Sequence, residues 1–217
     1  ICGLTQSQDD RTQIKIARQT PNEAQKSRVL GYLPQDSNPA PWLTAHQNLT
    51  MVLRLACAPG NHAVIADSLI AALGLSDLAE RFPNTFSGGQ RRKLAMAMAV
   101  VAKPSFILLD EPFSSVDAFT KLELYNFLFT LWDARISLSN QALEASACGM
   151  IIVTHDIQEA SLLGDRLIVL QEKPVKSSIE IENNPRTQRQ NQDPTAWWFT
   201  DKHKEISKQV NAALKKE

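Results

Sequence analysis

Short runs of apolar residues alternate along this chain with longer segments in which apolar residues recur at helical spacing. Two runs, FILL at 106–109 and MIIV at 150–153, are apolar throughout, which is typical of parallel strands buried on both faces. Further strands are predicted over residues 12–17, 29–33 and 167–170. The two fully apolar runs end on polar residues, DE in one case and TH in the other, so polar chemistry is expected where these strands end.

Apolar residues three or four positions apart predict helices between these strands. The predicted helices cover residues 44–55, 62–73 and 120–132, and a last helix, capped near Asp193, carries Phe199, Ile206, Val210 and Leu214 on one face. Alternation of strands and helices predicts an α/β architecture. Residues 133–149 exceed what a simple crossover needs and are interpreted as a surface insertion.

Composition and charge narrow the possible partners. Of the 217 residues, 43% are hydrophobic and 21% are charged, and the formal net charge is zero. A chain of this length can bury one sizeable core. A neutral chain gives no electrostatic argument for nucleic acid or for an anionic membrane. Since no apolar run approaches the roughly 18 residues of a membrane span, we expect neither nucleic acid nor a direct membrane span.

The cysteines and the first residues say little about chemistry. Cys2, Cys57 and Cys148 are scattered and form no CxxC pair, so buried thiols in a reducing compartment are expected rather than disulfides or zinc. The chain begins with Ile1, and the opening ICGLTQ lacks the pattern of a signal peptide. We expect that further residues precede it in the natural protein.

Two adjacent carboxylates, Asp110 and Glu111, follow the strand at 106–109, and Pro112 comes next. Carboxylates at the carboxyl end of a buried parallel strand face the crevice where α/β proteins bind ligands. One can hold Mg²⁺, usually through water, while the other orients an attacking water. The alternative interpretation is a solvated turn.

The stretch Ser87-Gly88-Gly89-Gln90 stands at the start of a predicted helix. Glycines let a ligand approach the backbone, and the free amides of a helix start favour anions. The basic run 91–93 (RRK) opposes the helix dipole, which is expected if this end meets negative charge. The alternative is that the glycines only cap a helix.

Two single residues complete the candidate chemistry. His155 follows the strand at 150–153, where it could hydrogen-bond a terminal phosphate, although such a histidine is more often structural. Gln35 follows the strand at 29–33 and could equally be an ordinary loop residue.

The order of these motifs along the chain resembles that of the ATP-binding cassette (ABC) ATPases, over roughly residues 29–170. The resemblance implies a P-loop NTPase-like α/β core with a helical subdomain, and it implies ATP and Mg²⁺ as ligands. By this resemblance, Gln35 is the Q-loop glutamine, and Gln35 and Asp110 are associated with Mg²⁺. Glu111 is the general base and His155 is the switch histidine. The signature motif consists of Ser87, Gly88, Gly89 and Gln90, and Asp117 belongs to the D-loop. Phe86 and Ser115 depart from the family's commoner residues.

The resemblance also predicts how the chain is divided. Residues 1–34 would be the remainder of the N-terminal strands, 35–95 the Q-loop with the helical subdomain, 96–182 the core and 183–217 a polar helical extension. The GxxxxGK[ST] phosphate loop (Walker A) does not occur in the sequence. The segment ICGL resembles the end of the helix that follows this loop, so we expect a truncated chain that is inactive by itself.

The activity implied by the resemblance is ATP hydrolysis coupled to transport. The stretch PAPWLTAHQNL resembles the ATPases of nitrate, sulfonate and taurine importers. Such a subunit would form a homodimer, bind transmembrane permease subunits at the cytoplasmic face of the inner membrane as a peripheral protein, and work with an extracytoplasmic solute-binding protein. Two alternatives are a non-transport ABC ATPase and an inactive regulatory relative that lacks the phosphate loop.

Overall fold

The chain folds into two compact units, Ile1–Val153 and Thr154–Glu217. The structure, a computed structural model, describes residues 14–16, 18–114, 116–132, 137–138, 141–142, 149–171, 177–183 and 201–214. Each unit has its own secondary structure.

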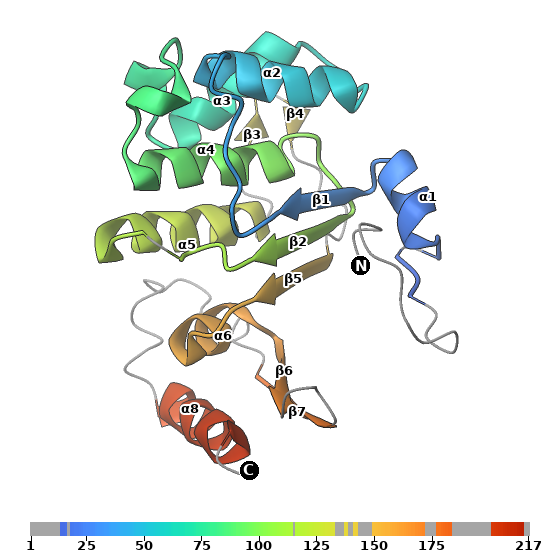
Figure 1. Ribbon diagram of the computed structural model, residues 1–217, viewed down its shortest axis with the longest axis vertical. Coiled ribbons are helices and arrows are strands. Elements are labelled where there is room, and N and C mark those ends of the chain that lie inside the picture. The colour runs from blue at the N-terminus through green and yellow to red at the C-terminus, as the bar shows by residue number, and fades with distance from the viewer. Residues whose placement is uncertain are drawn as a thin grey trace. The chain divides into compact units, whose positions relative to one another are not determined.

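The first unit is built on a parallel sheet (Figure 1). Its described strands are β1 (Leu30–Leu33), β2 (Phe106–Asp110) and β5 (Gly149–Val153), in the order β1-β2-β5. The register pairs Leu33 with Leu109 and Asp110 with Val153. All three strands therefore end at the same edge of the sheet, and this confirms the predicted α/β architecture.

The first unit also contains helices, some of which pack against one another and against this sheet. They are α1 (Pro21–Lys26), α2 (Ala45–Leu55), α3 (His62–Ala72), α4 (Gly88–Val100) and α5 (Ala118–Trp132), with 3₁₀ turns η1 (Ser76–Leu78) and η2 (Pro83–Thr85). α2 packs on α3 and α4, and α4 packs on β1 (Figure 1). A Cβ on Gly31 would collide with the carbonyl oxygen of Ala99 and lie 2.8 Å from Pro104 Cγ, so glycine is required for this close approach of β1 to α4.

Capping boxes fix where these helices begin. Thr44 accepts from the amide of Gln47, and the Gln47 side chain accepts in return from the amide of Thr44. Ser87 and Gln90 make the same reciprocal pair at the start of α4. Because such a box satisfies two otherwise unpaired amides, the sequence itself positions each helix start.

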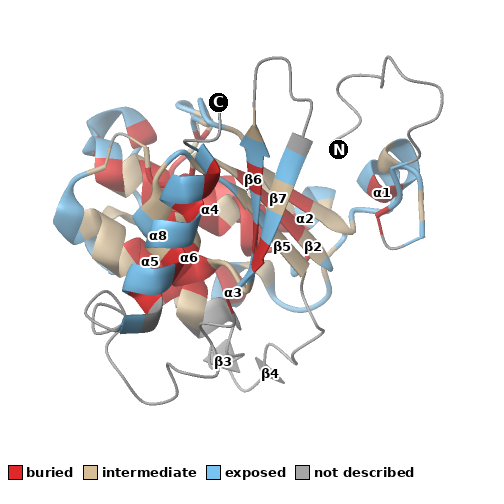
Figure 2. Ribbon diagram, turned by 90° about the horizontal axis from the view of Figure 1, so that it is seen from below, coloured by how far each residue is buried: buried red, intermediate tan, exposed pale blue. Residues whose placement is uncertain are grey.

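The described residues of the second unit form a hairpin and two helices. Its elements are α6 (Ile157–Leu163), β6 (Arg166–Gln171), β7 (Ser177–Glu182) and α8 (Asp201–Leu214). β6 and β7 pair in antiparallel register, and buried and exposed residues alternate along β6 (Figure 2). Its core consists of Leu167, Val169, Ile181, Ile206, Val210 and Ala213. α8 is therefore held by Ile206 and Val210 of the predicted apolar face, whereas Leu214, predicted on the same face, is exposed.

Most of the predicted elements are confirmed within one or two residues, including the strand at 167–170, but the strand predicted over 12–17 is wrong. The strand at 167–170 is β6, which pairs with β7 in an antiparallel hairpin and has Ile168 and Leu170 on its exposed face. Among the described residues of 12–17, Ile16 forms one isolated bridge to Gln19 and Ile14 is exposed. Because Ile16 pairs with Gln19, only three residues later, the backbone turns back here and is too short to pair as a strand.

Three further expectations have mixed outcomes. Cys57 is exposed, so the prediction of buried thiols is wrong for it, while Cys2 and Cys148 lie outside the described residues. In the predicted insertion 133–149, the described residues are Gly149, which begins β5, and two short paired strands, β3 (Ser137–Leu138) and β4 (Gln141–Ala142). The predicted cap at Asp193 and the position of Phe199 lie outside the described residues.

A buried histidine belongs to the packing of α8. The ring of His203 is 7% exposed, with Nδ1 2.8 Å from the hydroxyl of Ser161 and Nε2 3.5 Å from that of Ser207. Burial lowers the pKa of His203, because the charged imidazolium is penalised when it loses its hydration. Folding of this unit therefore favours the neutral ring.

We expect the second unit to lose stability on acidification. The pKa of His203 is lower in the folded than in the unfolded chain, whose histidines titrate near about 6.5. The contribution of His203 to the free energy of unfolding is therefore complete above about pH 6.5. It is lost as the pH falls through the lower pKa that His203 has in the folded chain. Urea unfolding followed at pH 7.5 and pH 5.5 measures it. His203→Gln, which cannot titrate, should show a smaller difference between the two pH values; an equal difference would contradict the assignment.

Candidate active site

The two predicted carboxylates stand at the carboxyl end of β2. Asp110 is the last residue of the strand, and the amide of Glu111 donates to the carbonyl of Val153 on β5 (2.9 Å). Both side chains are partly exposed, whereas Pro112 and Phe113 behind them are buried. The pair is thus accessible from solvent at the edge where all three strands end.

Glu111 has a backbone conformation that is uncommon for a residue with a side chain. Its φ is +46°, in the left-handed region. The backbone amide of Ser114 (3.1 Å) and its hydroxyl (2.9 Å) both donate to the Glu111 carbonyl. Such strain persists only where surrounding contacts overdetermine it, and it is concentrated at functional sites.

Arg92 binds the backbone behind these carboxylates. The residue lies on α4 and is 7% exposed. Its donors reach five carbonyl oxygens: Pro112 from Nε (2.7 Å), Pro34 (3.2 Å) and Gln35 (3.0 Å) from Nη1, and Asp110 (3.2 Å) and Glu111 (2.7 Å) from Nη2. Burial lowers the pKa of Arg92, and the nearby negative charges of Asp110, Asp36 and Glu111 oppose this shift.

Gln35 is brought to the same place. It lies in the turn after β1, its side chain is exposed, and Arg92 binds its carbonyl together with that of Glu111. β1 and β2 are neighbouring parallel strands, so Gln35 and Asp110 flank one stretch of sheet edge. The structure thus places Gln35 at the same sheet edge as Asp110 and Glu111, and its predicted role at Mg²⁺ stays a prediction.

The donor set suits Mg²⁺ with a nucleotide. Asp110 and Gln35 offer a carboxylate and an amide oxygen, and Mg²⁺ typically takes one or two protein oxygens and completes its shell with water and phosphate. Among the described residues there is no group of three or more His, Cys, Asp or Glu side chains that could hold a metal ion. These residues therefore fit a cation that arrives with phosphate.

The glycine motif at the start of α4 has two different glycines. Gly88 is exposed, whereas Gly89 is buried, and a Cβ on Gly89 would lie 2.8 Å from the side chain of Thr120. Gly89 is therefore needed for the packing of α4 against the start of α5. The amides of Gly88 and Gly89, at the first two helical positions, have no intrahelical acceptor and remain suited to an anion.

Asp117 serves as a local cap. Its carboxylate accepts from the amide (3.0 Å) and the hydroxyl (2.7 Å) of Thr120. The side-chain hydrogen bond from Thr120, followed by the backbone one, lowers the pKa of Asp117. The carboxylate therefore orders the start of α5 beside Gly89, and its predicted contact with nucleotide stays a prediction.

The basic run at residues 91–93 is expected where the start of α4 meets negative charge, but its side chains bind groups within the first unit. Arg91 donates to the carbonyl of Phe86, Arg92 binds the five carbonyls, and Lys93 forms an ion pair with Glu123 on α5. Arg92 and Lys93 are buried. These cations therefore meet negative groups of their own unit, a pairing between distant segments that sequence spacing cannot reveal.

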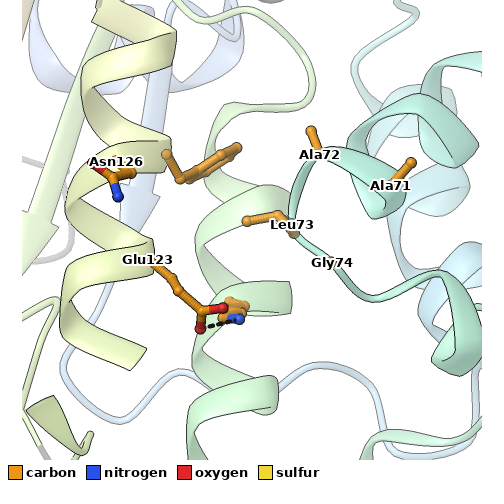
Figure 3. A pocket seen from close by; sticks show the side chains of 8 residues that line it. Ala71, Ala72, Leu73, Gly74, Glu123 and Asn126 are labelled. Atoms are coloured by element: carbon orange, nitrogen blue, oxygen red, sulfur yellow. Dashed lines mark ion pairs between the residues drawn. The ribbon is translucent and has the colours of Figure 1, made fainter. Parts of the chain in front are cut away.

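A pocket of about 390 Å³ lies elsewhere in the first unit (Figure 3). Residues 71–74 at the end of α3, Lys93 of α4, and Glu123, Asn126 and Phe127 of α5 line it. Figure 3 shows the Lys93–Glu123 ion pair at its wall. None of the candidate site residues lines this pocket. The candidate active site is therefore the sheet edge and not the pocket.

His155 belongs to the second unit. It is exposed and lies between β5 and α6, where the next residue, Asp156, accepts from the amides of Gln158 and Glu159. The hydroxyl of Thr154 donates to buried Glu159 (2.6 Å). Residues on both sides of His155 are thus fixed by side-chain hydrogen bonds, and its role at a phosphate stays a prediction.

The fold is that of the P-loop nucleoside triphosphatases. The chain superposes on a solved ATP-binding cassette, a dimer in a post-hydrolysis state bound to ADP and Pi, with a TM-score of 0.61 and 25% identity, covering 76% of this chain and 71% of the other. Residues 1–114 match the family profile described as "ABC transporter". The match covers more than half of the sequence, and the chain belongs to the ABC transporter family.

Curated relatives are similar over much of the chain. The formylaminopyrimidine import ATP-binding protein of Halalkalibacterium halodurans is 32% identical, over 74% of this chain and 60% of its own length. An aliphatic sulfonates import ATP-binding protein of Paracoccus denitrificans is 36% identical (64% and 51%), and the taurine import ATP-binding protein of Mesorhizobium japonicum is 38% identical (62% and 48%). The chain thus spans about half to three fifths of these relatives. Within the described part of the chain, no helix has the length and hydrophobicity needed to span a bilayer.

The left-handed backbone at Glu111 predicts a difference between two substitutions. Asn tolerates this region several-fold better than most residues, whereas Gln does not. Glu111→Asn should therefore be more stable than Glu111→Gln by about 0.5–1 kcal/mol. Urea unfolding of the two variants, which both remove the charge, measures the difference. Equal stabilities would show that the backbone at this position is not strained.

Proposed function

We propose that this chain is part of an ATP-hydrolysing subunit of an ABC importer for small solutes of the sulfonate and taurine type. One observation carries the proposal. In this chain, which belongs to the ABC transporter family, the side chain of Arg92 binds the backbone carbonyls of Gln35, Asp110 and Glu111 at one sheet edge. The relatives are named as import proteins for sulfonates, taurine and formylaminopyrimidine, which supports the solute class.

In the proposed reaction, water attacks the γ-phosphate of ATP and gives ADP and phosphate. Glu111 orients the water and accepts its proton. Asp110 and Gln35 hold Mg²⁺, which when bound supplies positive charge for the phosphates. His155 would donate a hydrogen bond to the transferring group, in line with its place after β5.

A second copy of the chain is part of the proposal. Ser87, Gly88, Gly89 and Gln90 form a capped helix start with two unpaired amides, which suits the γ-phosphate of a nucleotide held mainly by the other subunit. The ADP-bound structural neighbour is described as a dimer, which supports this arrangement. In such a homodimer, Asp117 beside Gly89 would face the same nucleotide.

We further propose that the loop before α2 docks on a transmembrane permease. Buried Asn48 binds the carbonyls of Ala40, Leu43 and Thr44 and accepts from the amide of Ala40, so this loop is rigid. It presents Trp42, which is 74% exposed. Exposed aromatic side chains on a rigid loop are typical anchors of protein interfaces.

These partners imply a location and a supply of solute. A subunit that binds a permease would be peripheral at the cytoplasmic face of the inner membrane. An extracytoplasmic solute-binding protein would deliver the solute to that permease, as the resemblance to importer ATPases implies.

Removing the carboxylate of Glu111 should abolish turnover. Glu111→Gln keeps the shape of the side chain but cannot accept a proton, so ATP hydrolysis should fall by at least about 100-fold while ATP binding stays within about threefold. Phosphate release is measured on the polypeptide encoded by the complete reading frame, together with binding of a fluorescent ATP analogue. Glu80→Gln, at an exposed carboxylate outside the site, is the control. Retained hydrolysis in Glu111→Gln would refute the assignment.

Trp42→Ala should separate hydrolysis from coupling. Binding to the permease should weaken by at least about tenfold, because a large apolar anchor is lost, whereas hydrolysis without the permease should stay within about twofold. Pull-down and ATPase assays with and without reconstituted permease measure both. Leu55→Ala is the matched control, since exposed Leu55 is the last residue of α2, about 15 Å along the helix from its first residue. Equal effects of the two substitutions would exclude Trp42 as the anchor.

A further inference from the structure

Arg92 connects segments that are far apart in the sequence. Its guanidinium binds residues 34–35 after β1 and residues 110–112 after β2, and its own backbone lies in the second turn of α4. α4 begins at its N-cap Ser87. Arg92 therefore links the helix that starts at the glycine motif to the turn at Gln35 and to the backbone of the two carboxylates. None of these three segments is adjacent to another in the sequence.

The hydrogen bonds use the whole donor capacity of the side chain. A guanidinium has five N–H groups in one rigid plane. One donor from Nε and two from each terminal nitrogen match the five carbonyl oxygens that Arg92 reaches. Since the plane is rigid, these carbonyls cannot move independently while the bonds hold.

We propose that Arg92 is a positioning residue that sets Glu111 and Gln35 relative to α4, and that it makes these elements move together. This inference rests on the proposed function, because it concerns the same site. Arg92 reaches only backbone carbonyls at the site, so it acts through the residues whose backbone it holds. A shift of α4 would thus carry the water-orienting carboxylate and the glutamine with it.

The conformation of Glu111 shows why this hold matters. Its φ of +46° is unfavourable, and its carbonyl accepts from both Arg92 and Ser114. Without Arg92 the Ser114 bonds and the ladder between β1 and β2 remain, but the side-chain link from the two loops to α4 is lost. The carboxylate would keep its local turn and its strand, and would lose the hydrogen bonds that fix both loops against α4.

The next residue provides a matched control. Lys93 is also buried, also charged and also on α4, but it pairs with Glu123 at the pocket wall. Lys93→Gln therefore tests the cost of removing a buried helix cation without touching the sheet edge. Arg92→Lys retains the charge but supplies three donors from one point instead of a planar fork.

Steady-state kinetics of the polypeptide encoded by the complete reading frame test the positioning role. Arg92→Lys and Arg92→Gln should lower kcat for ATP hydrolysis by at least about tenfold and leave KM within about threefold, because Arg92 sets the carboxylate and does not contact ATP. Lys93→Gln should keep kcat within about twofold. Equal losses in the Arg92 and Lys93 variants, or a rise in KM with unchanged kcat, would overturn the proposal.

Hydrogen exchange tests the coupling without relying on hydrolysis. In the Arg92 variants, peptides covering residues 30–36 and 108–114 should gain deuterium together, and neither should do so in Lys93→Gln. A gain in one peptide alone, or in neither, would overturn the coupling. If the wild-type polypeptide hydrolyses no ATP, the proposed function fails, and the exchange result still decides whether Arg92 joins the two segments.

Discussion

A buried guanidinium must find acceptors for all of its donors, and this requirement organises the candidate site. Arg92 pays for its burial by binding five carbonyls, and these come from the ends of two neighbouring strands. Carbonyls past a strand end have no ladder partner, so they are the natural acceptors at this edge. The same charge that orders the loops stands behind Asp110 and Glu111, whose negative charges help to keep it ionised.

Close packing at two glycines brings α4 into position for this role. Gly31 lets β1 approach the backbone of α4, and Gly89 lets α4 approach Thr120 at the start of α5. A side chain at either position would displace the helix that carries Arg92. The second glycine of the signature motif thus has a packing role in addition to any contact with phosphate.

The two units differ in the contacts that hold their elements. Side-chain and backbone hydrogen bonds fix the strand ends of the first unit, whereas apolar contacts and the neutral ring of His203 hold α8 in the second. Apolar packing carries little directional information. In the first unit, a substitution of Arg92 would therefore remove directional hydrogen bonds at the strand ends.

The sequence by itself determined the longer helices, the three parallel strands and the residues at their ends, because periodicity, capping pairs such as Thr44 with Gln47, and apolar runs are local signals. The short helices α1 and α6 were not predicted. The sequence also placed Asp110, Glu111 and Gln35 at strand ends, which must share an edge in a parallel sheet. Only the tertiary structure decided that Arg92 and Lys93 turn inward, that Glu111 has a left-handed backbone, and that the strand at 167–170 belongs to a hairpin. These features depend on which distant carbonyls, carboxylates and strands come within reach after folding, and no local spacing encodes that.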